Sequence, residues 1–98
     1  MSSQRNNRRT ASYRNLLSNL PAEVQKLAEE AFLRFCDAPE SAALRVHKLK
    51  SDGRGKHRPN SISVSVNRQY RAIYVEDGDT NVWYWIGTHA AYDTFIGT

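Results

Sequence analysis

The strongest constraint on the fold of this chain is a change in the spacing of its apolar residues. Over residues 24–35 apolar side chains recur every three or four positions, which predicts an amphipathic helix over residues 22–36. From residue 44 the spacing falls to two, and residues 61–66 alternate apolar side chains with serine. Helices followed by consecutive strands with short turns predict an α+β domain with an antiparallel sheet.

We expect an N-terminal helical hairpin packed on one face of a small, curved antiparallel sheet. The other face would stay open and carry the serines of residues 61–66. The further expected elements are a short helix starting at Thr10 or Ser12, strands over residues 44–49, 70–76 and 82–86, and a closing helical turn over 89–96.

The chain has 98 residues, which is enough for one domain. Residues 1–9 are polar and rich in arginine, so we expect a disordered basic tail followed by a single domain over residues 10–98. No run of about 18 apolar residues and no secretory signal is present, which predicts a protein without a membrane span. With one cysteine, Cys36, no internal disulfide can form, and we expect a cytoplasmic location.

The formal net charge is +4, and the charge is unevenly distributed. Basic residues crowd residues 45–58, whereas no lysine or arginine follows residue 71. This polarity favours a face that binds a polyanion, although a solvated surface would have the same composition. The residues that we predict to contact RNA are Arg45, Lys48, Lys50, Arg54, Lys56, His57, Arg58 and Arg68.

A possible catalytic group lies near the C-terminus. His89 follows the last predicted strand, Arg71 lies at the start of the strand before it, and Tyr92 comes three residues after His89. Histidine can exchange a proton near neutral pH, the arginine fork can hold a phosphate, and tyrosine can stack on a base. Together they would suit RNA cleavage by attack of a 2′-hydroxyl on the adjacent phosphorus, without a metal or another cofactor.

Each of these residues also has a purely structural interpretation. His89 could cap a helix or bond a carbonyl group, and Arg71 could pair with Glu76 or Asp93. Trp83 and Trp85 are two positions apart, which would place both on one side of a strand. The other two histidines of the chain do not form a metal-binding spacing with His89, so we expect no metal site.

In the order of its elements the chain resembles the RelE/ParE superfamily of type II toxins. The matching segments are NLPAEVQKLAEEAF (19–32), LRVHKLK (44–50), SISVSVNRQYRAIY (61–74), the DGD turn (77–79) and WYWIGTHAAYD (83–93). This resemblance implies a toxin that cleaves mRNA in the ribosome, inhibits translation and is held inactive by a cognate antitoxin. It also implies that Arg71 stabilises the phosphorane, that His89 is the general acid or base, and that Tyr92 helps to orient the RNA.

The chain departs from that family pattern at two places. Where many cleaving relatives carry a basic residue, it has Ser63 and Ser65, and an arginine-rich tail replaces the usual first strand. The sheet would then lack an edge strand. These departures keep two alternatives open: a non-enzymatic inhibitor of DNA gyrase like the ParE branch, or a degenerate module that binds RNA or a partner without cleavage.

Overall fold

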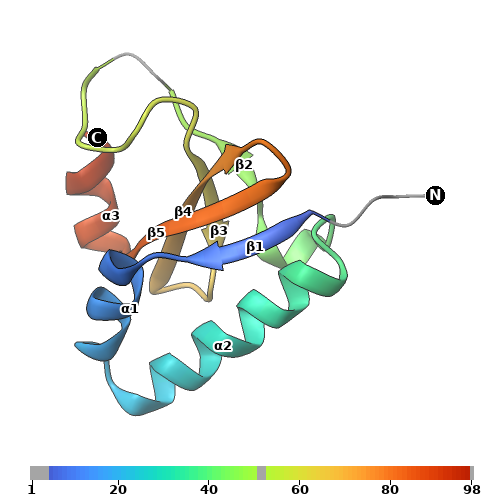
Figure 1. The fold of residues 1–98 in the computed structure, drawn as a ribbon. Coiled ribbons are helices and arrows are strands. Elements are labelled where there is room, and N and C mark those ends of the chain that lie inside the picture. The colour runs from blue at the N-terminus through green and yellow to red at the C-terminus, as the bar shows by residue number, and fades with distance from the viewer. Residues whose placement is uncertain (1–4, 51–52, 98) are drawn as a thin grey trace.

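The computed structural model describes residues 5–50 and 53–97 of the chain. In chain order its elements are β1 (Asn6–Arg9), α1 (Ala11–Ser18), α2 (Ala22–Asp37), the 3-10 turn η1 (Ala42–Leu44), β2 (His47–Lys48), β3 (Ile62–Ser65), β4 (Tyr70–Asp77), β5 (Thr80–Thr88) and α3 (His89–Ile96). Figure 1 shows α2 running along the sheet, with α3 at the end where β5 finishes. The predicted α+β class, with a helical hairpin on a sheet, is confirmed.

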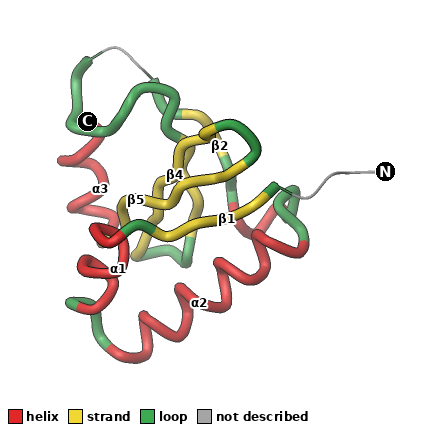
Figure 2. The backbone as a smooth tube through the Cα atoms, viewed as in Figure 1, coloured by secondary structure: helices red, strands yellow, loops and turns green. Residues whose placement is uncertain are grey.

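The five strands form one sheet in the order β1-β5-β4-β3-β2. The four strands from β2 to β5 pair antiparallel, as predicted, but β1 pairs parallel to β5, so the sheet is mixed (Figure 2). The predicted strand over residues 44–49 is shortened to two residues in β2. Arg45, at the end of η1, has a left-handed φ of 46°, which is incompatible with an extended strand at that position.

The predicted helix over residues 22–36 is present as α2, and its apolar stripe forms the main core with the sheet. Trp83 of β5 lies at the centre of this core. Phe32 and Phe35 approach its ring edge-on at centroid distances of 5.1 and 5.0 Å, and Tyr74 stacks on it at 5.2 Å. Such aromatic contacts add to the burial of apolar area, so they fix the angle at which α2 crosses the sheet.

The prediction of a disordered tail over residues 1–9 is wrong for residues 6–9, which form β1. The side chain of Asn7 explains how so polar a segment is held: its Oδ1 accepts hydrogen bonds from the Trp83 indole Nε1 at 3.0 Å and from Asn81 Nδ2 at 3.2 Å. The expected loss of an edge strand is therefore also wrong. Residues 1–4 lie outside the described residues.

The two tryptophans of β5 do not share a face, contrary to the expectation from their spacing. Trp83 pairs with Tyr74 while Trp85 pairs with Ile73, so an irregularity at Tyr84 inserts one extra residue into β5. Because neighbouring residues of β4 point to opposite faces, Trp85 turns away from the main core. Its ring stacks instead on Phe95 of α3 at 4.9 Å.

The expected open face with exposed serines is also wrong, because Ser61, Ser63 and Ser65 are all buried. Ser63 shares a row of the sheet with Ile73 and therefore with Trp85. Since Trp85 stacks on Phe95 of α3, this helix packs on the face that carries the serines. The closing helical turn predicted over residues 89–96 thus covers the second face of the sheet.

Candidate functional site

The three predicted catalytic residues lie together at the start of α3. Arg71 stands at the beginning of β4, and its Cζ atom lies 5.5 Å from the ring centroid of Tyr92. The rings of His89 and Tyr92 are 6.0 Å apart. Tyr92 is buried, so its ring is a fixed neighbour of Arg71 and of the exposed His89.

His89 does not serve as the helix cap, because Thr88 does: the Thr88 hydroxyl accepts a hydrogen bond from Ala91 N at 3.1 Å. The backbone N–H of His89 donates to the carbonyl of Gln69 at 2.7 Å, which ties the start of α3 to the turn before β4. The imidazole stays accessible, and its Nε2 lies 3.5 Å from Asp93 Oδ2. A carboxylate beside an accessible imidazole can orient the ring for proton transfer.

Asp93 lies beside His89, a contact that was not expected from the sequence. Its carboxylate, suggested from the sequence as a partner of Arg71, approaches His89. The signal is present in the sequence, because His89 and Asp93 are four residues apart and such pairs meet on one face of a helix. The other suggested partner of Arg71, Glu76, lies at the far end of β4 and approaches Arg5 at 3.9 Å.

Arg71 borders a cavity of about 680 Å³ together with Arg45 and Arg68, two of the residues predicted to contact RNA. Its Nε is buried and has no hydrogen-bond partner among the described residues. The turn that carries Arg68 is fixed by Asn67, whose Oδ1 accepts from the backbone N–H groups of Gln69 and Tyr70. A buried donor without a partner, in a cavity with three guanidinium groups, suits an anionic ligand.

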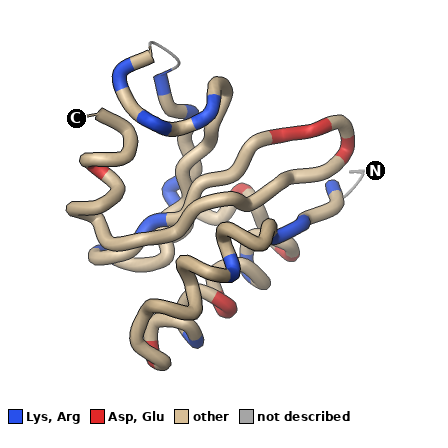
Figure 3. Tube along the Cα trace, turned by 60° about the vertical axis from the view of Figure 1, so that its left-hand side comes forward, with Lys and Arg blue, Asp and Glu red and all other residues tan. Residues whose placement is uncertain are grey.

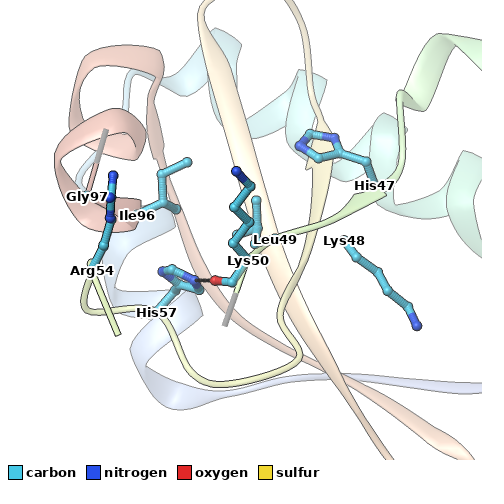
Figure 4. Close-up of a pocket in the computed structure, with 8 residues that line it drawn as sticks. All are labelled: His47, Lys48, Leu49, Lys50, Arg54, His57, Ile96 and Gly97. Atoms are coloured by element: carbon cyan, nitrogen blue, oxygen red, sulfur yellow. Dashed lines mark hydrogen bonds between the residues drawn. The ribbon is translucent and has the colours of Figure 1, made fainter. Parts of the chain in front are cut away.

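The other predicted RNA contacts are divided between separate places. Lys48, Lys50, Arg54 and His57 border a second cavity of about 500 Å³ beside the last residues of α3 (Figure 4). Arg58 lies over the ring of Tyr84 at 5.6 Å, and Lys56 borders an apolar cavity between α1, β5 and α3. Figure 3 shows basic residues gathered on the loop beside the C-terminal end, whereas the tip of the β4–β5 hairpin is acidic.

Cys36 does not belong to this site. It lies on α2 and packs against the main core, and burial raises the pKa of its thiol. A raised thiol pKa lowers the fraction of thiolate, which is the nucleophilic form. In residues 5–50 and 53–97 no group of three or more His, Cys, Asp or Glu side chains is placed to hold a metal ion.

None of the helices in the described part of the chain is long and apolar enough to cross a bilayer.

These features define a class: a small α+β domain with a helical hairpin on one sheet face, a closing helix on the other and a cationic site at the start of that helix. The family model of the ParE-like toxin domain matches residues 22–94. The chain therefore belongs to the ParE-like toxin domain family, which agrees with its resemblance to the RelE/ParE superfamily.

Several solved structures have a similar fold. YafQ from Escherichia coli BL21(DE3) is similar over 91% of this chain and 98% of its own, with a TM-score of 0.63 and 18% identity. The RelBE2 toxin–antitoxin complex of Mycobacterium tuberculosis contains a chain with a TM-score of 0.57 and 23% identity, covering 89% of this chain and 100% of that one. A chain of the RelB–RelE antitoxin–toxin complex of Methanococcus jannaschii has a TM-score of 0.59 and 19% identity, covering 90% of this chain and 98% of that one. A search of curated proteins found no match.

Proposed function

We propose that the chain is the toxin of a type II toxin–antitoxin system and an endoribonuclease that cleaves mRNA on the ribosome, which inhibits translation. The observation that carries this proposal is the group formed by Arg71, Tyr92 and His89, in which Arg71 also borders a cavity with Arg45 and Arg68. It combines a phosphate clamp on β4 with an aromatic ring and an accessible proton donor or acceptor in the first turn of α3. The similar proteins crystallised as complexes with antitoxins support a cognate antitoxin as the partner of this chain in the cytoplasm.

The proposed reaction needs only groups that the RNA and the protein supply. The ribose 2′-oxygen forms a bond to the adjacent phosphorus, and the bond from phosphorus to the 5′-oxygen breaks. A proton leaves the 2′-hydroxyl and another reaches the departing 5′-oxygen, so that a 2′,3′-cyclic phosphate and a 5′-hydroxyl remain. His89 exchanges one of these protons, and Arg71 stabilises the negative charge of the phosphorane.

The position of Asp93 gives His89 a defined role in this reaction. The carboxylate approaches Nε2, so a protonated His89 would use Nδ1 toward the RNA while Nε2 faces Asp93. Arg71 then acts from strand β4, and the ring of Tyr92 lies near both side chains. The basic side chains that are absent at Ser63 and Ser65 are replaced by Arg45 and Arg68, which border the same cavity as Arg71.

The test is induced expression in a bacterial host, followed by mapping of mRNA 5′ ends. We expect growth arrest and new 5′ ends with the wild type, and a loss of cleavage by about 100-fold or more with His89→Ala and with Arg71→Ala. Arg34→Ala, which changes an exposed arginine of α2, is the matched control and should cleave like the wild type. Unchanged cleavage in both His89→Ala and Arg71→Ala would refute these roles.

A second candidate function is inhibition of DNA gyrase without catalysis. It is favoured by one observation, namely that the matching family model describes the ParE-like toxin domain. The same experiment separates the two candidates. Growth arrest with intact mRNA and signs of DNA damage, equal in the wild type and His89→Ala, would establish the gyrase inhibitor and reject the ribonuclease.

A further inference from the structure

The second cavity, beside the last residues of α3, has the composition of an anion site. It is bordered by Lys50, Arg54, His57 and His47, with Ile96 and Gly97 of the C-terminal segment as its apolar part. Figure 4 shows Lys50, Arg54 and His57 gathered on one side of the cavity, while the side chain of Lys48 points away from them. Among the described residues that border it, three are lysine or arginine and none is acidic, which suits an anionic ligand.

The cavity is held in shape by close contacts of its backbone. Gly55 crosses the end of α3 so closely that a Cβ atom there would collide with the backbone of Phe95 and Ile96. A Cβ on Gly97, whose φ is 82°, would lie 2.6 Å from the carbonyl oxygen of Arg54. Two glycines therefore interlock the basic loop with the helix end, and this arrangement fixes the position of the loop that carries Arg54.

Two hydrogen bonds complete this arrangement. Lys56 N donates to the Phe95 carbonyl at 2.6 Å, so one of the last carbonyl groups of α3 is satisfied. This matters because bare carbonyls at a helix C-terminus repel anions. His57 Nε2 lies 2.6 Å from the carbonyl oxygen of Lys50 and must donate, since a carbonyl oxygen only accepts. The imidazole of His57 thereby links the end of the loop to the backbone of Lys50.

Strand β3 links the second cavity to the cavity of Arg71. His47, at the edge of the second cavity, pairs with Ser63, and Ser65, at the edge of the Arg71 cavity, pairs with Arg71. Ser63 and Ser65 are two residues apart, which is about 7 Å along a strand. An extended strand of nucleic acid that runs along β3 could therefore reach both cavities.

We propose that the second cavity binds a phosphate of the RNA chain that flanks the phosphate held at Arg71, with Lys50 and Arg54 as its ligands and His57 as the positioning residue of Lys50. This inference rests on the proposed function in taking RNA as the ligand, and it adds a minimum length to the substrate. A dinucleotide can occupy the Arg71 cavity alone, whereas a longer strand reaches both. Affinity should then depend on RNA length through Lys50 and Arg54.

The test measures binding of the full chain to 2′-O-methyl RNA, which lacks the attacking hydroxyl and so is not cleaved. Fluorescence anisotropy with strands of two to eight nucleotides, over a range of salt concentrations, gives the affinity and its salt slope for each length. For the longer strands we expect the double variant Lys50→Ala with Arg54→Ala to lower the slope of log K against log salt by about 1. For the dinucleotide, wild type and double variant should bind alike. Lys26→Ala, an exposed lysine on α2, is the control.

His57 is tested by a pair of variants. The substitution His57→Gln keeps a side-chain N–H that can donate to the Lys50 carbonyl, so the length dependence should be retained, whereas His57→Ala should reduce it as the double variant does. Circular dichroism and thermal unfolding of each variant show that the fold is kept. A role that is only structural would weaken binding of every length equally.

The two proposals fail in different ways. A double variant that binds all lengths as the wild type does, or loses affinity equally for all, overturns the second phosphate site even if the wild type cleaves mRNA. A wild type that leaves cellular mRNA intact but shows the expected length dependence refutes the ribonuclease and supports the phosphate site.

Discussion

Tyr92 lies near both of the side chains that are proposed to perform the chemistry. Its ring contacts the Arg71 guanidinium and the His89 imidazole at 5.5 and 6.0 Å, and it is buried. Because the ring of Tyr92 is buried, we expect it to hold Arg71 in place rather than to stack on a base of the RNA. The role that the family resemblance implied, orientation of the RNA, would then be exerted through Arg71.

This role of Tyr92 predicts different effects for two substitutions. Tyr92→Phe keeps the ring and should cleave RNA within a few-fold of the wild-type rate. Tyr92→Ala removes the contact that positions Arg71, and cleavage should fall by about 10- to 100-fold. The measurement is the cleavage rate of a purified mRNA fragment, with urea unfolding to correct for the cavity left in Tyr92→Ala. A Tyr92→Phe variant as slow as Tyr92→Ala would instead assign the chemistry to the hydroxyl group.

At the level of elements, β1 shows why a polar segment can be a strand. Its sequence, NNRR, carries no apolar alternation and therefore no strand signal. What holds it comes from distant residues: parallel pairing with residues 80–83 of β5 and the hydrogen bonds of Asn7 to Trp83 and Asn81. Such partners are joined only after the fold has formed, so local sequence patterns could not predict them.

The contact between Asn7 and Trp83 gives a test of this strand. Asn7→Ala leaves the indole N–H of Trp83, which is buried, without its acceptor, and the free energy of unfolding should fall by about 1–3 kcal/mol. Asn6→Ala, at an exposed position of the same strand, should change it by less than about 0.5 kcal/mol. Urea denaturation measures both. If residues 6–9 were a disordered tail, neither variant would change the free energy of unfolding.

Other features of the fold also depend on residues that are distant in the sequence. Alternation showed that Ser61, Ser63 and Ser65 share a face, but whether that face is covered depends on α3, which follows two strands later. The extra residue at Tyr84 in β5 has no signal of its own, yet it decides that Trp85 faces α3. By contrast, the two ends of the β4–β5 hairpin must meet, so the closeness of Arg71 and His89 was predictable.

For the molecule as a whole, the described residues form one cationic cavity beside Arg71 and another at the last residues of α3. The acidic tip of the β4–β5 hairpin lies away from the basic loop beside the C-terminal end (Figure 3). The residues predicted to bind RNA do not form one continuous patch: Arg45 and Arg68 border the cavity of Arg71, whereas Lys48, Lys50, Arg54 and His57 border the second cavity. The sequence order of charges predicted the polarity of the molecule. The division into two cavities arises because the loop over residues 53–58 packs on the end of α3 rather than beside Arg71.

The main core of the molecule carries its own dependence on pH, independent of the functional site. Burial raises the pKa of Tyr13 and of Tyr74 to about 12, from an ordinary value of 10.0. Below pH 10 both the folded and the unfolded chain keep these phenol protons, and the full stabilisation is present. Between about pH 10 and 12 the unfolded chain loses them while the folded chain retains them, so the free energy of unfolding falls as the pH rises.

This linkage predicts alkaline destabilisation that can be assigned to named residues. Each of the two tyrosines should lower the free energy of unfolding by up to about 1.4 kcal/mol per pH unit in that range. Tyr13→Phe and Tyr74→Phe should each remove part of the slope, and the double variant should remove more than either. Urea unfolding at pH values from about 9 to 12 measures the slopes. An equal slope in the wild type and the double variant would mean that other groups cause the alkaline loss, and that burial in the core does not hold these two protons.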